Sequence, residues 1–187
     1  MAGCPKRWTA LAAEPLQDCV VFRVSRTLAR SPHTGEVHPF YRIDADAWVN
    51  VVALTDGGDV VMVRQYRHGA EELTLEIPGG MVDPGEAPES AAARELLEET
   101  GYRAREIVPA GQLNPNPALF ANRVHTYVAL GCERVGEAAN HGLEETSVEL
   151  VPRAELRRRV HAGEIDHALV VAALYWLELW EGGAAAR

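Results

Sequence analysis

Short apolar runs separated by turn residues fill the first half of the chain, a pattern typical of β-strands. We predict strands over 19–24, 37–43, 48–54, 60–66 and 73–77. The segment Asp56-Gly57-Gly58-Asp59 stands between the third and fourth runs, and its glycines allow the positive φ of a hairpin turn. Those two runs should therefore pair.

The residues 88–100 form the clearest helical segment, because they contain no internal helix breaker and end at Gly101, a favourable C-cap residue. Further strands are predicted over 107–113, 123–130 and 148–151, and two helices over about 152–161 and 166–180. Mixed strands with few helices indicate the α/β (α+β) class and an α/β sandwich. We expect one domain over 1–187, with an N-terminal β segment at about 17–45.

Charge narrows the partners that the chain can bind. Of the 187 residues, 18 are Lys or Arg and 27 are Asp or Glu, which leaves a net charge of -9 and disfavours a nucleic acid. Six of the acids lie within the 23 residues 80–102, which hold one base. The excess acidity is therefore concentrated in one segment.

The cysteine content and the apolar runs indicate the cellular compartment and whether the chain enters a membrane. Three cysteines without CxxC spacing suggest neither a disulfide framework nor a zinc site, so we expect a reducing cytoplasm. The first ten residues lack the apolar core of a signal peptide, and the longest apolar run, 168–177, is too short to cross a bilayer. We expect no membrane association.

Three glutamates of the predicted helix share one face. Each residue turns a helix by about 100°, so Glu95, Glu98 and Glu99 fall within one arc, opposite an apolar arc. Like charges at these spacings repel, so a neutralising cation is expected. One interpretation is a solvated acidic face on which Arg94 pairs with Glu98; the other is a divalent metal site, because Mg²⁺ prefers hard oxygen ligands.

The segment from Gly80 to Tyr102 resembles the signature of the Nudix hydrolases. Its defining positions are occupied here by Gly80, Glu86, Arg94, Glu95, Leu96, Glu98, Glu99, Gly101 and Tyr102. Tyr102 is the loosest match. The resemblance favours the metal site over the solvated face.

The resemblance implies a Nudix fold, in which a mixed sheet lies between helices, and cleavage of a nucleoside diphosphate linked to a further group. It also implies roles for individual residues. Metal ligands for Mg²⁺ or Mn²⁺ would be Glu95, Glu98, Glu99 and the carbonyl of Gly79, and Arg94 with Glu86 would orient them.

Three further runs are similar to the branch that acts on ADP-ribose and nucleoside diphosphate sugars: 63–67, 75–80 and 114–118. In the last of them Pro117 stands sixteen positions after Gly101, where that branch carries a marker proline. The alternatives are another Nudix substrate class, such as a dinucleoside polyphosphate or a nucleoside triphosphate, or a non-catalytic sensor of nucleotide sugars.

Substrate contacts are predicted from a strand end and a loop. Arg64 and Arg67 lie on opposite faces of their predicted strand, so one of them should reach the substrate phosphates, and we favour Arg67. Pro117 should shape the pocket, and Phe120 could stack on a base.

The resemblance also implies where a general base lies. In this branch the base comes from an acidic loop, here 141–146, so Glu144 is the first candidate and Glu145 the second. The loop carries His141 and Gly142 where the branch usually has more acids. Members of this branch are commonly homodimers that share the substrate site, and we expect the same here.

Overall fold

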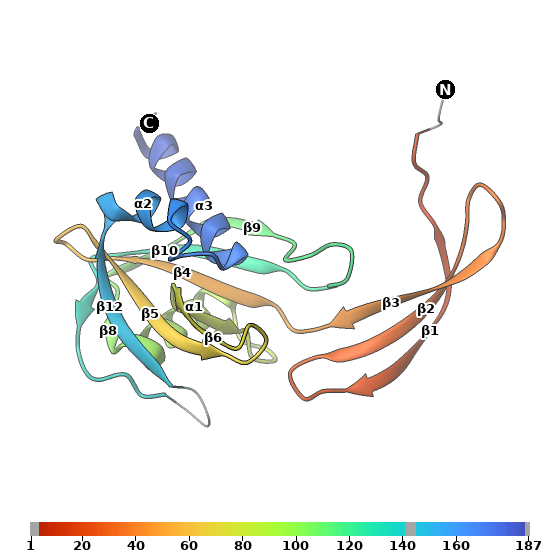
Figure 1. The fold of residues 1–187 in the computed structure, drawn as a ribbon, viewed down its shortest axis with the longest axis horizontal. Coiled ribbons are helices and arrows are strands. Elements are labelled where there is room, and N and C mark those ends of the chain that lie inside the picture. The colour runs from red at the N-terminus through yellow and green to blue at the C-terminus, as the bar shows by residue number, and fades with distance from the viewer. Residues whose placement is uncertain (1–3, 141–144, 186–187) are drawn as a thin grey trace. The chain divides into compact units, whose positions relative to one another are not determined.

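A computed structural model describes residues 4–140 and 145–185, which fall into two units (Figure 1). The N-terminal unit comprises Met1–Asp46 and Asn114–Arg123, and the main unit comprises Ala47–Leu113 and Val124–Arg187. Each is described by itself. The expected single domain over 1–187 stays a prediction.

The N-terminal unit is built on a three-stranded antiparallel sheet. Its strands are β1 (Thr9–Asp18), β2 (Arg23–Arg30) and β3 (Val37–Asp44), in the order β1-β2-β3. The strand predicted over 37–43 is confirmed, whereas the one over 19–24 is wrong. Cys19 to Phe22 form the turn between β1 and β2, in which Val20 has a φ of 69° and is 97% exposed.

The misplaced strand has a local cause. β1 is rich in alanine and carries Pro15 and Glu14, so it lacks the β-branched alternation that marks a strand. The apolar residues Val20 and Val21 gave that signal instead, although the Asp18 carboxylate accepts the backbone N–H of Val20 at 2.9 Å and closes the turn there. Val20 and Val21 are therefore exposed turn residues, although an apolar run usually indicates a buried strand.

The main unit contains a seven-stranded mixed sheet. Its central path runs β12-β5-β4-β10-β9, with β6 paired to β5 and β7 to β4. Among the described strands of this sheet, β4 and β10 alone pair in parallel, and β4 and β5 form the expected hairpin. The strands are β4 (Trp48–Leu54), β5 (Asp59–Arg67), β6 (Glu72–Glu76), β7 (Gly79–Met81), β9 (Glu106–Leu113), β10 (Val124–Leu130) and β12 (Thr146–Pro152).

Sequence patterning located this sheet well. The strands predicted over 48–54, 60–66, 73–77, 107–113, 123–130 and 148–151 are confirmed to within two residues at each end. The short strands β7, β8 (Tyr102–Arg103) and β11 (Glu133–Arg134) were missed, because two or three residues carry no periodicity.

Alternating side chains along the central strands build two cores. Val51 and Val61 face helix α1 (Pro88–Thr100), where Ala92 and Leu96 pack against them. Their chain neighbours Val52 and Met62 belong to the opposite core, with the helices that follow β12. The sheet therefore lies between two helical layers, as Figure 1 shows for this unit.

The second helical layer follows β12. It consists of a 3₁₀ turn (Arg153–Glu155), α2 (Leu156–His161) and α3 (Ala168–Ala185). The two predicted helices are confirmed, but the second one begins two residues later and runs five residues further than 166–180. No helix in the described part of the chain is long and apolar enough to traverse a membrane.

Helix α1 has the boundaries that its sequence predicts. Pro88 occupies the first turn, where its missing N–H costs nothing, and Gly101 ends the helix in the left-handed region with a φ of 71°. A Cβ at Gly101 would lie 2.3 Å from the carbonyl oxygen of Gly136. This end of the helix therefore requires glycine for two reasons, the backbone angle and the space.

Gly101→Ala should separate these two reasons when it is compared with Gly163→Ala. Gly163 follows α2 with a φ of 74° and has nothing within 4 Å of its Cβ position, so alanine there should cost only left-handed strain, about 1–2 kcal/mol. Gly101→Ala should cost about 1–3 kcal/mol more, because backbone must shift. Urea denaturation measures both, and equal losses would contradict the steric argument.

Candidate active site

Helix α1, which packs on one face of the sheet, carries the three predicted carboxylates. Its apolar face packs Ala91, Ala92 and Leu96 into the core. Glu95 and Glu99 lie against the turn that follows β6. The side chain of Glu95 is only 11% exposed, and Glu99 is also buried. Two carboxylates are therefore largely removed from water on one short stretch.

Arg94 donates hydrogen bonds to three surrounding glutamates. Its Nε and Nη2 donate to the two carboxylate oxygens of Glu86 at 3.1 and 3.0 Å, and Nη1 donates to Glu95 Oε1 at 2.8 Å and to Glu98 Oε2 at 3.2 Å. Nη2 also donates to the carbonyl of Met81 at 3.0 Å. The structure thus brings Arg94 and Glu86 together, and it contains the Arg94–Glu98 pair as well.

Both partners of the Arg94–Glu86 pair are held in their charged forms. Hydrogen bonds from Arg94 lower the pKa of Glu86, and the carboxylate of Glu86, followed by those of Glu95 and Glu98, raises the pKa of Arg94 above its usual value. Arg94 is therefore a permanent cation in this cluster.

The turn at Gly79 and Gly80 fits against the same face of the helix. The backbone N–H of Gly79 donates to Glu99 Oε2 at 2.9 Å. A Cβ at Gly80 would lie 2.4 Å from Glu95 Oε1, and one at Gly79 would lie 2.3 Å from the carbonyl oxygen of Val49. Only glycine allows backbone to approach the carboxylates this closely.

This arrangement suits a hard divalent cation. Glu86, Glu95, Glu98 and Glu99 carry four formal negative charges against one from Arg94, so the cluster keeps a net charge of -3. Carboxylate oxygens beside a glycine backbone are the donor types that Mg²⁺ and Mn²⁺ accept. Within the described residues no group of three His, Cys, Asp or Glu side chains is gathered closely enough to hold a metal ion as the side chains stand.

The segment that leads to the predicted base is attached to the same helix. The backbone N–H of Ala139 donates to the carbonyl of Glu98 at 2.7 Å, and Thr146 Oγ1 donates to the carbonyl of Glu99 at 2.8 Å. Carbonyls at a helix C-terminus lack helical partners, so the segment satisfies them. Glu145 is exposed beside Thr146, and Glu144 lies outside the described residues.

The two candidate phosphate-binding arginines differ in their partners. Nε and Nη2 of Arg67 donate to the two oxygens of Glu76, both at 2.7 Å, and Thr74 Oγ1 donates to Glu76 Oε1 at 2.6 Å. Glu76 is 4% exposed while Arg67 is 44% exposed, so a buried carboxylate holds an accessible guanidinium. Arg64 instead pairs with Glu149 of β12 at 2.7 Å.

Glu76 is a functional candidate that the sequence did not single out. It lay within the run 75–80 but was not a predicted site residue. Its contact with Arg67 depends on the pairing of β5 with β6, in which Arg67 lies opposite Glu72 and Val63 opposite Glu76, and no local sequence pattern indicates that pairing. Burial raises the pKa of Glu76, but hydrogen bonds from Arg67 and Thr74 and the charge of Arg67 together lower it by more than burial raises it. The net pKa is below the usual value.

Pro117 and Phe120 belong to the N-terminal unit. The amide of Phe120 donates to the carbonyl of Asn116 at 2.8 Å, and Phe120 forms a parallel bridge with Ile43 at the end of β3. A substrate role for either residue stays a prediction.

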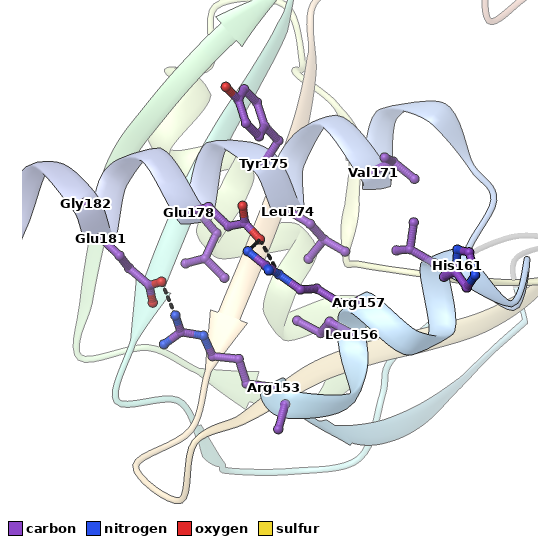
Figure 2. Close-up of a pocket in the computed structure, with 13 residues that line it drawn as sticks. Arg153, Leu156, Arg157, His161, Val171, Leu174, Tyr175, Glu178, Glu181 and Gly182 are labelled. Carbon is purple, nitrogen blue, oxygen red and sulfur yellow. Dashed lines mark hydrogen bonds and ion pairs between the residues drawn. The ribbon is translucent and has the colours of Figure 1, made fainter.

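A groove of about 1070 Å³ lies between α2 and α3, and none of the predicted site residues lines it (Figure 2). All its lining residues lie between Arg153 and Gly182, with Leu156 and Leu174 among the apolar ones. Ion pairs join Arg157 to Glu178 at 3.0 Å and Arg153 to Glu181. The groove therefore takes its walls from the second helical layer and not from helix α1.

Comparisons with known proteins agree with this geometry. The NUDIX domain family matches residues 46–174. An ADP-ribose pyrophosphatase of Mycobacterium tuberculosis is 33% identical over 88% of this chain and 80% of its own, and one of Bacillus subtilis is 33% identical over 71% and 72%. A solved structure described as an ADP compounds hydrolase matches with a TM-score of 0.85 at 23% identity, covering 98% of both chains.

The chain therefore belongs to the NUDIX family of hydrolases. The predicted Nudix fold, a mixed sheet between helices, is confirmed by the solved structure and by the two helical layers. Enzymes of this family generally need a divalent metal ion.

Glu76→Gln should destabilise the protein by about 1–3 kcal/mol near neutral pH, because a buried charge-assisted hydrogen-bond network is broken. The folded-state pKa of Glu76 is depressed, so its contribution is complete above the unfolded-state value of about 4.3 and is lost as pH falls below that. Urea denaturation of both proteins from neutral to acid pH should show the difference shrinking.

Glu72→Gln is the matched control, since Glu72 is exposed on the same strand β6. It should change stability little at any pH. A Glu76→Gln deficit that stays constant down to acid pH would contradict the role of the charged carboxylate.

Proposed function

We propose that this protein hydrolyses the diphosphate bond of ADP-ribose or a related nucleoside diphosphate sugar. For ADP-ribose, water adds to one phosphorus, a P–O bond of the anhydride breaks, and AMP and ribose 5-phosphate result. The carrying observation is the acidic face of α1 against the Gly79–Gly80 turn, together with relatives named ADP-ribose pyrophosphatase. Mg²⁺ or Mn²⁺ is the proposed cofactor.

The residues around helix α1 would have distinct roles in metal binding and positioning. Glu95, Glu98, Glu99 and the carbonyl of Gly79 would hold the metal, which when bound neutralises the diphosphate and lowers the pKa of the attacking water. Arg94 would orient the carboxylates, and its double contact with Glu86 keeps the guanidinium in a fixed plane. The pair thus restricts where the carboxylate oxygens can lie.

The general base is proposed on the segment tied to the end of helix α1. Glu144 is the first candidate and Glu145 the second. Thr146, the next residue after Glu145, donates to the carbonyl of Glu99, which supports a base at that end of the helix. Kinetics of Glu144→Gln and Glu145→Gln would rank them: the true base should lose about two to four orders of magnitude in kcat while substrate Kd is kept. Similar small losses would exclude both.

Arg67 is the proposed contact for the substrate phosphates, and Arg64 the weaker candidate. The bidentate grip of Glu76 leaves Arg67 accessible in one orientation, which lowers the entropy lost when an anion binds. Pro117 would shape the pocket and Phe120 could stack on the base.

We also propose a cytoplasmic homodimer. Cys4, Cys19 and Cys132 are free thiols, which suits a reducing compartment. The N-terminal unit exposes the rings of Trp8 and Phe40, whose centroids lie 5.1 Å apart, an apolar surface that a second copy of the chain would cover. The mass of the protein in solution, measured by light scattering, tests this, and a monomeric mass would reject it.

Glu99→Gln should reduce kcat by at least about a hundredfold, since one charged ligand of the metal is lost. The glutamine carbonyl can still accept the Gly79 N–H, so thermal stability without metal should hardly fall. Purified variants are compared at saturating Mg²⁺. Glu89→Gln, an exposed acid in the first turn of the same helix, is the control and should keep wild-type turnover.

A substrate panel tests the proposed class. With Mg²⁺ or Mn²⁺, kcat/KM for ADP-ribose or a nucleotide sugar should exceed that for NADH and diadenosine polyphosphates by at least about tenfold, or roughly 1.4 kcal/mol. Pro117→Ala should narrow the gap, because a rigid loop favours a compact ligand. Equal or faster cleavage of the dinucleotides would reject the substrate class and leave the family assignment intact.

A further inference from the structure

Thr74 is a buried polar residue in the middle of β6, beside the ion pair of Arg67 and Glu76. It is 8% exposed, and its hydroxyl donates to Glu76 Oε1 at 2.6 Å, a distance typical of a hydroxyl bonded to a charged carboxylate. The backbone carbonyl of Gln65 lies 3.3 Å from the same hydroxyl oxygen. A hydroxyl has one proton to donate, so the shorter, charge-assisted contact with Glu76 takes it.

The strand register places Thr74 between the two members of the ion pair. In the antiparallel pairing of β5 with β6, Thr74 lies opposite Gln65. Glu76 stands two residues further along β6, and Arg67 stands two residues further along β5 in the opposite direction, each about 7 Å from that row. Residues two apart in a strand share one face, so Arg67 and Glu76 approach each other across the position of Thr74.

The hydrogen bond from Thr74 joins the ion pair to the sheet. Two parallel hydrogen bonds fix the guanidinium of Arg67 and the carboxylate of Glu76 relative to each other, but two long side chains bonded in this way can still turn together as one unit. Threonine is β-branched and stiff at χ1, so β6 itself holds the hydroxyl of Thr74. The third bond therefore fixes the carboxylate with respect to the strand, and the guanidinium with it.

The anchor acts on the exposed member of the pair. Glu76 is 4% exposed and is restricted by its packing, whereas Arg67 is 44% exposed and meets solvent. Packing therefore restricts the guanidinium less than the carboxylate, and the direction of the guanidinium follows that of the carboxylate to which it is bonded. Rotation of the pair in the free enzyme would have to be given up when an anion binds, which weakens binding.

We propose that Thr74 is a positioning residue for Arg67. Its hydroxyl holds the carboxylate of Glu76 on β6, and the carboxylate holds the guanidinium in the direction from which it meets the substrate diphosphate. The inference rests on the proposed function in one respect, the assignment of Arg67 to the substrate phosphates. The three hydrogen bonds stand without that assignment.

Steady-state kinetics with ADP-ribose at saturating Mg²⁺ test the proposal on two variants. Thr74→Val keeps the shape of threonine and suits a strand but lacks the hydroxyl, whereas Thr74→Ser keeps the hydroxyl. Thr74→Val should raise KM about five- to twentyfold and leave kcat within about twofold, because a phosphate contact made equally in the ground state and the transition state is weakened. Thr74→Ser should stay within about threefold of the wild-type KM. An unchanged KM in Thr74→Val, or a loss confined to kcat, would overturn the proposal.

Thr126→Val is the matched control. Thr126 is 1% exposed on β10 of the same sheet, and its hydroxyl has no hydrogen-bond partner among the described residues. This variant should keep both kinetic constants of the wild type. An equal rise in KM would contradict the proposal, since the loss of any buried hydroxyl of the sheet would then be enough.

A double variant tests whether the effect passes through Arg67. Arg67→Lys keeps the charge but cannot form the two parallel hydrogen bonds, so it should raise KM by itself. Thr74→Val added to Arg67→Lys should then raise KM by less than about twofold, because the guanidinium that Thr74 positions is already gone. Multiplication of the two single effects would show that Thr74 acts independently of Arg67 and would overturn the proposal.

A measurement without substrate separates the proposal from the proposed function. The order parameter of the Arg67 Nε–H bond vector, obtained from ¹⁵N relaxation and assigned by loss of the resonance in Arg67→Lys, should be about 0.85 in the wild type and in Thr74→Ser. It should fall below about 0.6 in Thr74→Val, and equal values in the wild type and Thr74→Val would overturn the proposal. If the wild type cleaved neither ADP-ribose nor a nucleotide sugar with Mg²⁺ or Mn²⁺, the proposed function would fail, and this order parameter would still decide whether Thr74 holds Arg67.

Discussion

The crowding of carboxylates on one face of helix α1 is the constraint on which the site depends. Acids at these spacings repel each other, and two of them, Glu95 and Glu99, are largely buried, so the helix needs compensating groups around it. Arg94 and the N–H of Gly79 supply part of that compensation. The packing of Ala92 and Leu96 into the core supplies the rest, because burial of the opposite face fixes the helix where the acids meet.

The sheet makes that position possible. Val51 and Val61 fill the core beneath α1, and Val52 and Met62 fill the core beneath α3. A shift of one residue in strand register would exchange the two sets of side chains. The turn at Gly79 pairs with β4 through β7, so the glycines that approach Glu95 and Glu99 take their place from the same register.

Sequence reasoning worked best where the information is local. The bounds of helix α1 follow from Pro88 and Gly101, and the three acids of its face follow from helical periodicity. It failed at the β1–β2 hairpin, where alanine-rich β1 gave no alternation and Val20 lies exposed in the turn. The ion pair of Glu76 with Arg67 could not be predicted, since it depends on the pairing of β5 with β6 and on the burial of Glu76 in the folded chain.

The attachment of the segment after β11 to helix α1 has a mechanical meaning. The backbone carbonyls of Glu98 and Glu99, two residues of the acidic face of α1, accept hydrogen bonds from Ala139 and Thr146. The same two residues thus present their side chains to the site and their backbone to this segment. A change at either anchor, Ala139 or Thr146, therefore acts on the backbone of the two residues whose side chains belong to the acidic face.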